Sequence, residues 1–222
     1  RHTRYWRDWS SDVCSSDLQL RTVINLHKGL TAPVVGLLML LYANTTTAAW
    51  VYLALHGTYG VLWLIKDWLF PDRQWQRPVG WSVVALGFLV LGLYWLAPWL
   101  LISSGAEAPG PLLAAAIALN LLGTFLHFGS DAQKHFTLAA RPGLICDGFF
   151  RYSRNPNYLG EILIYASFAL VAMHWQPWLV LAGFWLGVFV PNMRRKDESL
   201  ARHPEFAAWK DRTGLLLPKM IG

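Results

Sequence analysis

The chain has 222 residues, of which 55% are hydrophobic and 14% are charged, and its mean hydropathy is +0.32. About a quarter of the residues of a soluble domain are charged, so this composition excludes an ordinary soluble enzyme and predicts an integral membrane protein. The net charge of +6 is more typical of basic loops on one side of a membrane than of nucleic-acid binding, and we expect no nucleic-acid partner.

The first 18 residues differ from the rest of the chain, because they are polar and show no hydrophobic periodicity. Within them, RDWSSDVCSSDL is what one reading frame of a common sequencing-library adapter encodes. We therefore expect residues 1–18 to be a non-native tail and residues 19–222 to form a single membrane domain. Cys146 is the one cysteine outside this tail, so an intramolecular disulfide is excluded there.

Six long apolar segments follow one another along the chain. They cover residues 23–42, 46–65, 79–102, 112–128, 158–173 and 178–190. A bilayer crossing needs about 20 apolar residues, so the last two segments need tilt, flanking aromatic residues or a tight hairpin. The sequence predicts an all-α, polytopic membrane protein with about six transmembrane helices.

The basic residues of the connecting loops alternate along the chain. The loops after the first, third and fifth segments contain no Lys or Arg, whereas those after the second, fourth and sixth do. Basic loops remain cytoplasmic, so both termini and the polar motifs between residues 128 and 218 are predicted to lie on the cytoplasmic side.

The stretch RYSRNPNYLGE, residues 151–161, precedes the fifth apolar segment. Asn155 suits the N-cap position, and the start of a helix presents free N–H groups that favour an anion. Arg151 and Arg154 stand directly before it, and Arg194 and Arg195 follow the sixth segment. We expect these cations to hold the phosphate or carboxylate of a cofactor. The alternative is that they only set the topology and contact lipid phosphates.

Glu161 is the most unusual residue of this stretch. Asn157, Glu161 and Tyr165 are spaced by four and therefore share one helix face, with Tyr158 beside them. A carboxylate inside a membrane helix is costly and usually faces a partner or a wet cavity. Glu161 could accept hydrogen bonds from a cofactor or transfer protons. The alternative is a structural salt bridge to an arginine.

Four further side chains are candidates for the site. Asp131 and Lys134 follow the fourth apolar segment, where Asp131 could bind a ribose hydroxyl, pair with an arginine or remain solvated. His56 and Tyr59 lie within one helical turn and could line a substrate chamber or donate a proton, or else be hydrogen-bonded core residues. No spacing of His, Cys and acidic residues fits a metal site.

Two longer motifs carry a family resemblance. DGFFRYSRNPNYLGE and RRKDESLARHPEFAAWKDRTGLLLP resemble the C-terminal half of the steroid 5α-reductase and isoprenylcysteine carboxyl methyltransferase superfamily, and the nearest branch is the bacterial membrane proteins termed DUF1295. In the reductases, a similar Asn-Tyr-x-Gly-Glu segment, nearby arginines and an upstream Ser-Asp hold NADPH. In the methyltransferases, an Arg-His-Pro-x-Tyr-x-Gly segment and a later Glu-Glu pair hold S-adenosylmethionine.

The resemblance favours the reductases. Asn155 stands where the methyltransferases have His, Asn157-Tyr158-x-Gly160-Glu161 matches the reductase pattern, and Lys196-Asp197-Glu198 is not a Glu-Glu pair. The fold alone does not decide between the two chemistries. The substrate-binding acid of the steroid reductases has no assignable counterpart in this chain.

These comparisons imply an NADPH-dependent reductase of a lipid-like enone in the bacterial cytoplasmic membrane, in contact with lipid and a hydrophobic small-molecule substrate. The catalytic candidates are Tyr158, Glu161, His56 and Tyr59. The cofactor-binding candidates are Asp131, Lys134, Arg151, Arg154, Asn157, Tyr158, Glu161, Arg194 and Arg195. The alternative is an S-adenosylmethionine-dependent methyltransferase of a lipid or prenylated substrate, and the third possibility is a non-catalytic membrane scaffold.

Overall fold

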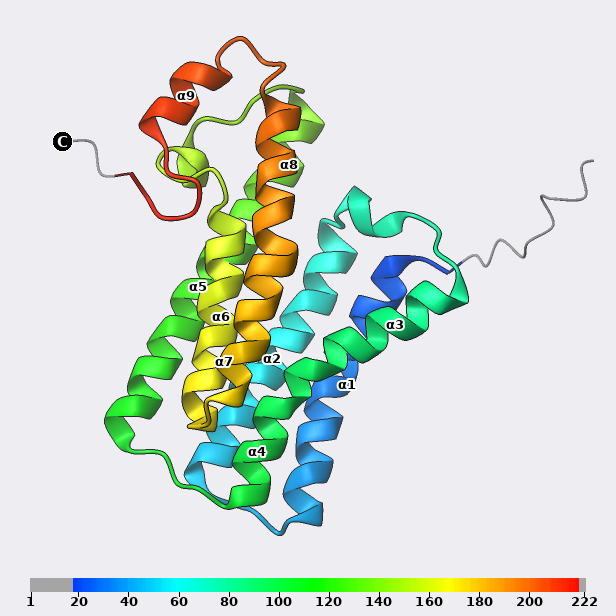
Figure 1. The fold of residues 1–222 in the computed structure, drawn as a ribbon, viewed down its shortest axis with the longest axis vertical. Coiled ribbons are helices and arrows are strands. Elements are labelled where there is room, and N and C mark those ends of the chain that lie inside the picture. Colours follow the sequence, from blue (N-terminus) through cyan, green and yellow to red (C-terminus); the bar gives the residue numbers. More distant parts are fainter. Residues whose placement is uncertain (1–17, 220–222) are drawn as a thin grey trace, which may run out of the picture.

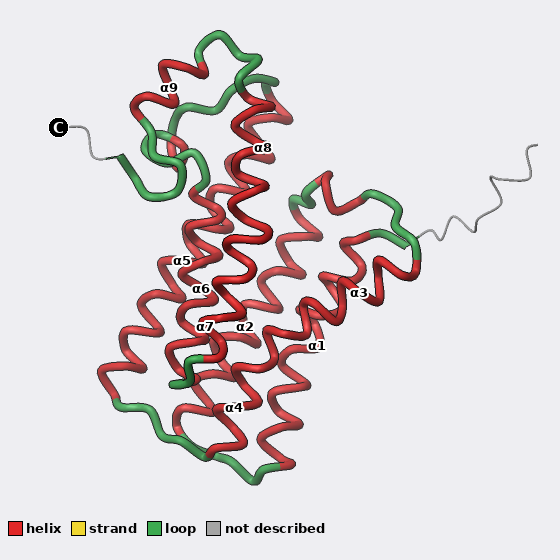
Figure 2. Tube along the Cα trace, viewed as in Figure 1, coloured by secondary structure: helices red, strands yellow, loops and turns green. Residues whose placement is uncertain are grey.

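A computed structural model describes residues 18–219 of the chain. In this range the protein is built from helices and short loops, and its only β-type pairing consists of two isolated bridges (Figure 2). The predicted all-α fold is therefore confirmed. The predicted non-native tail lies outside the described residues except for Leu18, the first of them.

Four helical segments are long and apolar enough to cross a membrane, namely α1 (Leu20–Leu41), α2 (Thr47–Leu69), the combined segment of α3 (Trp81–Gly92), η2 (Leu93–Trp95) and α4 (Leu96–Ser104), and α5 (Gly110–Ala140). The helix α6 (Pro156–Ala172) is apolar but shorter. Large hydrophobic side chains such as Leu40, Leu89 and Leu186 are exposed on the outside of the bundle. A protein with such a surface is embedded in a lipid bilayer.

The last long helical segment runs without a break through α7 (Gln176–Phe184), the π-helical turn η4 (Trp185–Phe189) and α8 (Val190–Leu200). Beyond the bundle, α8 leads to the short helix α9 (Phe206–Arg212), as Figure 1 shows. Two 3-10 turns, η1 (Arg73–Gln76) and η3 (Gly148–Phe150), lie in the long loops. Beside η3, the side chains of Ile145, Phe150, Phe206 and Trp209 form a small second core that holds α9 in place.

Helix α6 lies inside the bundle, where it contacts α2, α4, α5 and α7. Its closest neighbour is α5, because glycines let the two backbones touch. A Cβ atom on Gly123 would lie 2.6 Å from the carbonyl oxygen of Gly160. Real Cβ atoms do not approach a backbone oxygen this closely, so both positions require glycine. This contact fixes the face of α6 that carries Asn157, Glu161 and Tyr165.

Two predicted helix boundaries were wrong. The fourth segment was expected to end at Phe128, but α5 continues to Ala140, so Asp131 and Lys134 lie in a helix. The polar residues after the sixth segment likewise continue the helix as α8. In both cases the apolar run ends, but the backbone hydrogen bonds of the helix continue through the polar residues that follow. The end of an apolar run therefore does not mark the end of the helix.

One end of the bundle gathers the basic side chains, and we call it the basic end. There α1 begins, α2 and α5 end, and the described chain terminates (Figure 1). The residues on this end include Lys66, Arg77, Lys134, Arg141, Arg151, Arg154, Arg194 and Arg195. The polar motifs between residues 128 and 218, which were predicted to share one side of the membrane, lie at this end.

Candidate functional site

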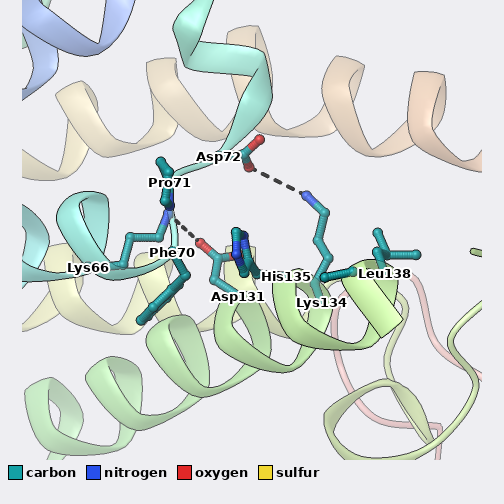
Figure 3. A pocket seen from close by; sticks show the side chains of 9 residues that line it. Lys66, Phe70, Pro71, Asp72, Asp131, Lys134, His135 and Leu138 are labelled. Carbon is teal, nitrogen blue, oxygen red and sulfur yellow. Dashed lines mark hydrogen bonds and ion pairs between the residues drawn. The ribbon is translucent and has the colours of Figure 1, made fainter. Parts of the chain in front are cut away.

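A pocket of about 200 Å³ opens at the basic end, between the end of α2 and the last turns of α5 (Figure 3). Two ion pairs line it. Lys66 Nζ lies 3.0 Å from Asp131 Oδ2, and Lys134 Nζ lies 3.4 Å from Asp72 Oδ2. The first pair is buried, with side chains 4% and 10% exposed, whereas the Lys134 side chain is 38% exposed. Asp131 is therefore bound to Lys66, and Lys134 is the cation that solvent can reach.

A second group of polar side chains lies deeper in the bundle. We call Lys28, Tyr59, Glu161 and Tyr165 the inner polar cluster. Lys28, Tyr59 and Tyr165 are buried, and the Lys28 ammonium donates a hydrogen bond to the Tyr165 hydroxyl. Glu161 lies one helical turn before Tyr165 on the same face of α6. The structure thus brings two predicted residues, Tyr59 and Glu161, together with Tyr165 of the predicted helix face.

Trp63 connects the pocket with the inner polar cluster. Its ring lies 4.9 Å from Lys66 Nζ and 5.1 Å from Lys28 Nζ, and it stacks on His127 with ring centroids 5.8 Å apart. Cations over an aromatic face are stabilised by the quadrupole of the ring. A single indole ring therefore contacts both Lys66 of the pocket and Lys28 of the inner polar cluster.

Two hydrogen-bond acceptors of this site have no partner among the described residues. The Oδ1 atom of Asn157 is buried and unpaired, and the Glu161 carboxylate forms no hydrogen bond or ion pair in the described part of the chain. The buried Asn157 Oδ1 atom without a donor costs about 1–3 kcal/mol, whereas the Glu161 side chain is half-buried. Such a pair of acceptors is suited to a ligand that carries N–H or O–H groups.

His127 is held next to these acceptors by the backbone of α6. Its Nδ1 atom lies 3.0 Å from the carbonyl oxygen of Asn157. A carbonyl can only accept, so this geometry assigns the proton to Nδ1. The Nε2 atom is buried without a partner. In the neutral ring, Nε2 is then a third unpaired acceptor.

The other two catalytic candidates differ in their surroundings. His56 is buried, stacks on Phe168 with ring centroids 4.0 Å apart, and places Nδ1 3.0 Å from the Tyr52 hydroxyl. Tyr158 is half-buried, and its ring lies 4.9 Å from that of Phe189 in the π-helical turn η4. Thus His56 belongs to the buried aromatic core, and Tyr158 lies nearer to the basic end.

The four candidate arginines differ in burial and in partners. Arg154 is buried, pairs with Asp197 at 3.1 Å, and donates to the carbonyl oxygens of Lys210 and Thr213. Its Nε and Nη1 atoms are thereby engaged by the protein, and a phosphate-binding role of Arg154 stays a prediction. Arg151, Arg194 and Arg195 are exposed and remain available to an anion.

The start of α6 also differs from the expectation. Asn155 occupies the N-cap position, but its side chain does not cap the helix. It donates instead to the carbonyl oxygen of Leu215, while its Oδ1 accepts a hydrogen bond from Lys196 at 3.1 Å. The Asn155 side chain therefore links the start of α6 to the C-terminal segment through Leu215 and to α8 through Lys196. The anion site at the helix start stays a prediction, because no side chain caps the first N–H groups of α6.

Lys196 provides a pH-dependent test of this arrangement. Its partial burial, with Lys134 nearby, lowers the pKa of Lys196 from 10.5 to about 8. The unfolded chain then binds more protons than the folded protein between these two values, so stability should rise with pH from about 8 to about 10.5. We expect this rise in thermal unfolding of the wild-type protein relative to Lys196→Met. A stability difference that does not change with pH would contradict the lowered pKa.

Two members of the site were missed by sequence reasoning. Lys28 and Lys66 both lie within apolar helices and are 3% and 4% exposed. The signal was present, because a lysine inside an apolar run must be paired or functional. The sequence could not show which way the Lys28 side chain points, because the residues that face it come from α2 and α6.

Comparison with known proteins agrees with the sequence motifs. Residues 79–213, more than half of the chain, match the model of a family described as protein of unknown function (DUF1295). Two uncharacterized proteins of Schizosaccharomyces pombe are similar in part. One is 32% identical over 97 residues, covering 40% of this chain and 28% of the relative, and the other is 53% identical over 34 residues, covering 15% and 12%. The chain thus spans less than a third of either relative, and by the family match it belongs to the DUF1295 family.

Proposed function

We propose that the protein is a membrane-embedded reductase that transfers hydride from NADPH to the carbon–carbon double bond of a lipid-like enone. One observation carries the proposal. The unpaired acceptors of Asn157 and Glu161 lie on one face of α6, in the site that contains the partly exposed Lys134 and the buried Lys28.

The residues of the site fit the chemical groups of NADPH. A nicotinamide carboxamide has an NH₂ group that suits the unpaired oxygens of Glu161 and Asn157. The phosphates of NADPH suit Lys134 and the exposed residues Arg151, Arg194 and Arg195. These cations lie at the basic end, which we place on the cytoplasmic side. When bound, NADPH supplies the hydride. The protein orients the ring, excludes water and holds the substrate in a hydrophobic chamber that opens towards lipid.

Binding measured by calorimetry tests this proposal. The full chain in detergent is titrated with NADPH and, separately, with S-adenosylmethionine. We expect saturable binding of NADPH, and we expect Glu161→Gln to raise its Kd about tenfold or more, because a hydrogen bond to a charged group contributes about 1.5–3 kcal/mol. Glu198→Gln is the matched control, since Glu198 is an exposed carboxylate on α8.

The outcomes separate the three functional classes. Equal NADPH affinity of the wild type and Glu161→Gln would remove Glu161 from the cofactor site. Binding of S-adenosylmethionine alone would place the protein among the methyltransferases. A folded protein that binds neither compound would be a scaffold.

A further inference from the structure

Lys28 has the most unusual environment of any charged side chain in the described part of the protein. It lies in the apolar helix α1, is 3% exposed, and forms no ion pair with a described residue. By contrast, the other buried lysine of the site, Lys66, is paired with Asp131 at 3.0 Å. An ammonium group inside a membrane helix is costly unless it is paired, and Lys28 lacks an anionic partner among the described residues.

Aromatic rings surround this ammonium group. Lys28 Nζ lies 4.3 Å from the ring centre of Tyr59, 5.1 Å from that of Trp63 and 4.9 Å from that of Tyr165. The rings stabilise a cation weakly and leave its N–H groups without strong acceptors. Of the three N–H groups, one donates to the Tyr165 hydroxyl, and no other described acceptor engages the remaining two. The site therefore offers donors to an oxygen atom that the protein itself does not provide.

We infer that Lys28 binds the carbonyl oxygen of the lipid substrate and that the inner polar cluster is the substrate chamber. This inference rests on the proposed function and deepens it. Lys28 of α1 donates to Tyr165, which lies on the same face of α6 as Glu161, so carbonyl and cofactor would meet between α1 and α6.

The reaction balances with Lys28 in this role. Hydride from NADPH adds to the β-carbon of the enone, and the π electrons move to the carbonyl oxygen to form an enolate. The Lys28 ammonium stabilises that developing negative charge by hydrogen bonding, as an oxyanion hole does. A proton from water then adds to the α-carbon and gives the saturated ketone and NADP⁺.

An apolar dent adjoins the inner polar cluster at Tyr165. It has a volume of about 10 Å³ and lies between η2–α4, α6 and α7, where Tyr165 lines it together with Tyr94. The Tyr94 ring stacks on the rings of Tyr165 and Phe184 with centroids 3.9 and 4.3 Å apart. The dent is too small for a lipid, so entry requires the Tyr94 ring to move.

Covalent trapping tests the inference without any enzymatic activity. The full chain in lipid vesicles is incubated with hexadecanal and cyanoborohydride near neutral pH. A lysine amine that reaches the aldehyde forms an imine with loss of water, and hydride from the cyanoborohydride reduces the imine to a stable secondary amine. We expect mass spectrometry to find the label on Lys28, and excess hexadecan-2-one at about ten times its Kd to lower that labelling roughly tenfold.

The exposed Lys210 is the internal control, because its labelling reports the chemistry and is not expected to respond to the ketone. Labelling of Lys210 without Lys28 would overturn the inference. Labelling of Lys28 that the ketone does not reduce would overturn it as well.

A second measurement separates this inference from the proposed function. Lys28→Met keeps the length and the apolar stem of the side chain but removes the donor. We expect it to bind NADPH like the wild type and to reduce a long-chain 2-alkenone roughly 10²–10³-fold more slowly, with Lys210→Met unchanged. Unchanged reduction by Lys28→Met would reject the role of Lys28 in catalysis. If the wild type binds no NADPH but Lys28 is labelled and protected by ketone, the chamber stands and the reductase proposal fails.

Discussion

Replacement of Arg154 with methionine is expected to lower the free energy of unfolding by about 3–5 kcal/mol. The substitution would leave Asp197 with no cation in its place and would free the carbonyl oxygens of Lys210 and Thr213, to which Arg154 now donates. Removal of one partner of a buried pair is costly because the other charge stays in a medium of low dielectric constant. The segment after α8 should then detach from α6.

Arg151→Met is the matched control, since Arg151 is three residues away and exposed. We expect its effect on stability to stay within about 0.5 kcal/mol. Thermal unfolding and limited proteolysis after residue 200 would measure both variants. Equal stability of the two would contradict the structural role of Arg154 and return it to the cofactor site.

The second large effect is expected at the buried pair of Lys66 and Asp131. Each single replacement, Lys66→Met or Asp131→Leu, should destabilise the protein by about 3–5 kcal/mol, because it leaves one unpaired charge 4–10% exposed. The double variant should recover most of this loss, since both charges are then absent. The coupling free energy follows from the four unfolding measurements.

The neighbouring pair of Lys134 and Asp72 is the control for this cycle. It lines the same pocket but is more exposed, with side chains 38% and 18% accessible. Its coupling should stay below about 1 kcal/mol. Additive effects of Lys66→Met and Asp131→Leu would mean that the coupling free energy of the buried pair is no larger than that of the exposed pair.

The sequence allowed the number and order of the helical segments to be predicted, because a membrane helix needs a long apolar run that is visible without any contact information. The ends of α5 and α8 were not predictable in this way, because hydropathy shows which residues are apolar enough to lie in a membrane and does not show where the backbone hydrogen bonds of a helix end. The π-helical turn η4 also left no signal in the apolar pattern.

For the site, local spacing was informative and long-range pairing was not. The four-residue spacing of Asn157, Glu161 and Tyr165 predicted one helix face, and all three belong to α6. By contrast, the sequence could not distinguish Arg154 from Arg151. The partner of Arg154 is Asp197, 43 residues further along the chain, and a charge pattern does not reveal such a contact.

Transfer of an isotope from the cofactor to a lipid tests the central claim most directly. The full chain in lipid vesicles is given a long-chain 2-alkenone and NADPH that carries deuterium at the transferable position of the nicotinamide ring. We predict a saturated ketone with one deuterium on the β-carbon, found by mass spectrometry and absent without protein. An alkenone that the folded protein leaves unchanged, while it binds or consumes S-adenosylmethionine, would contradict the reductase account.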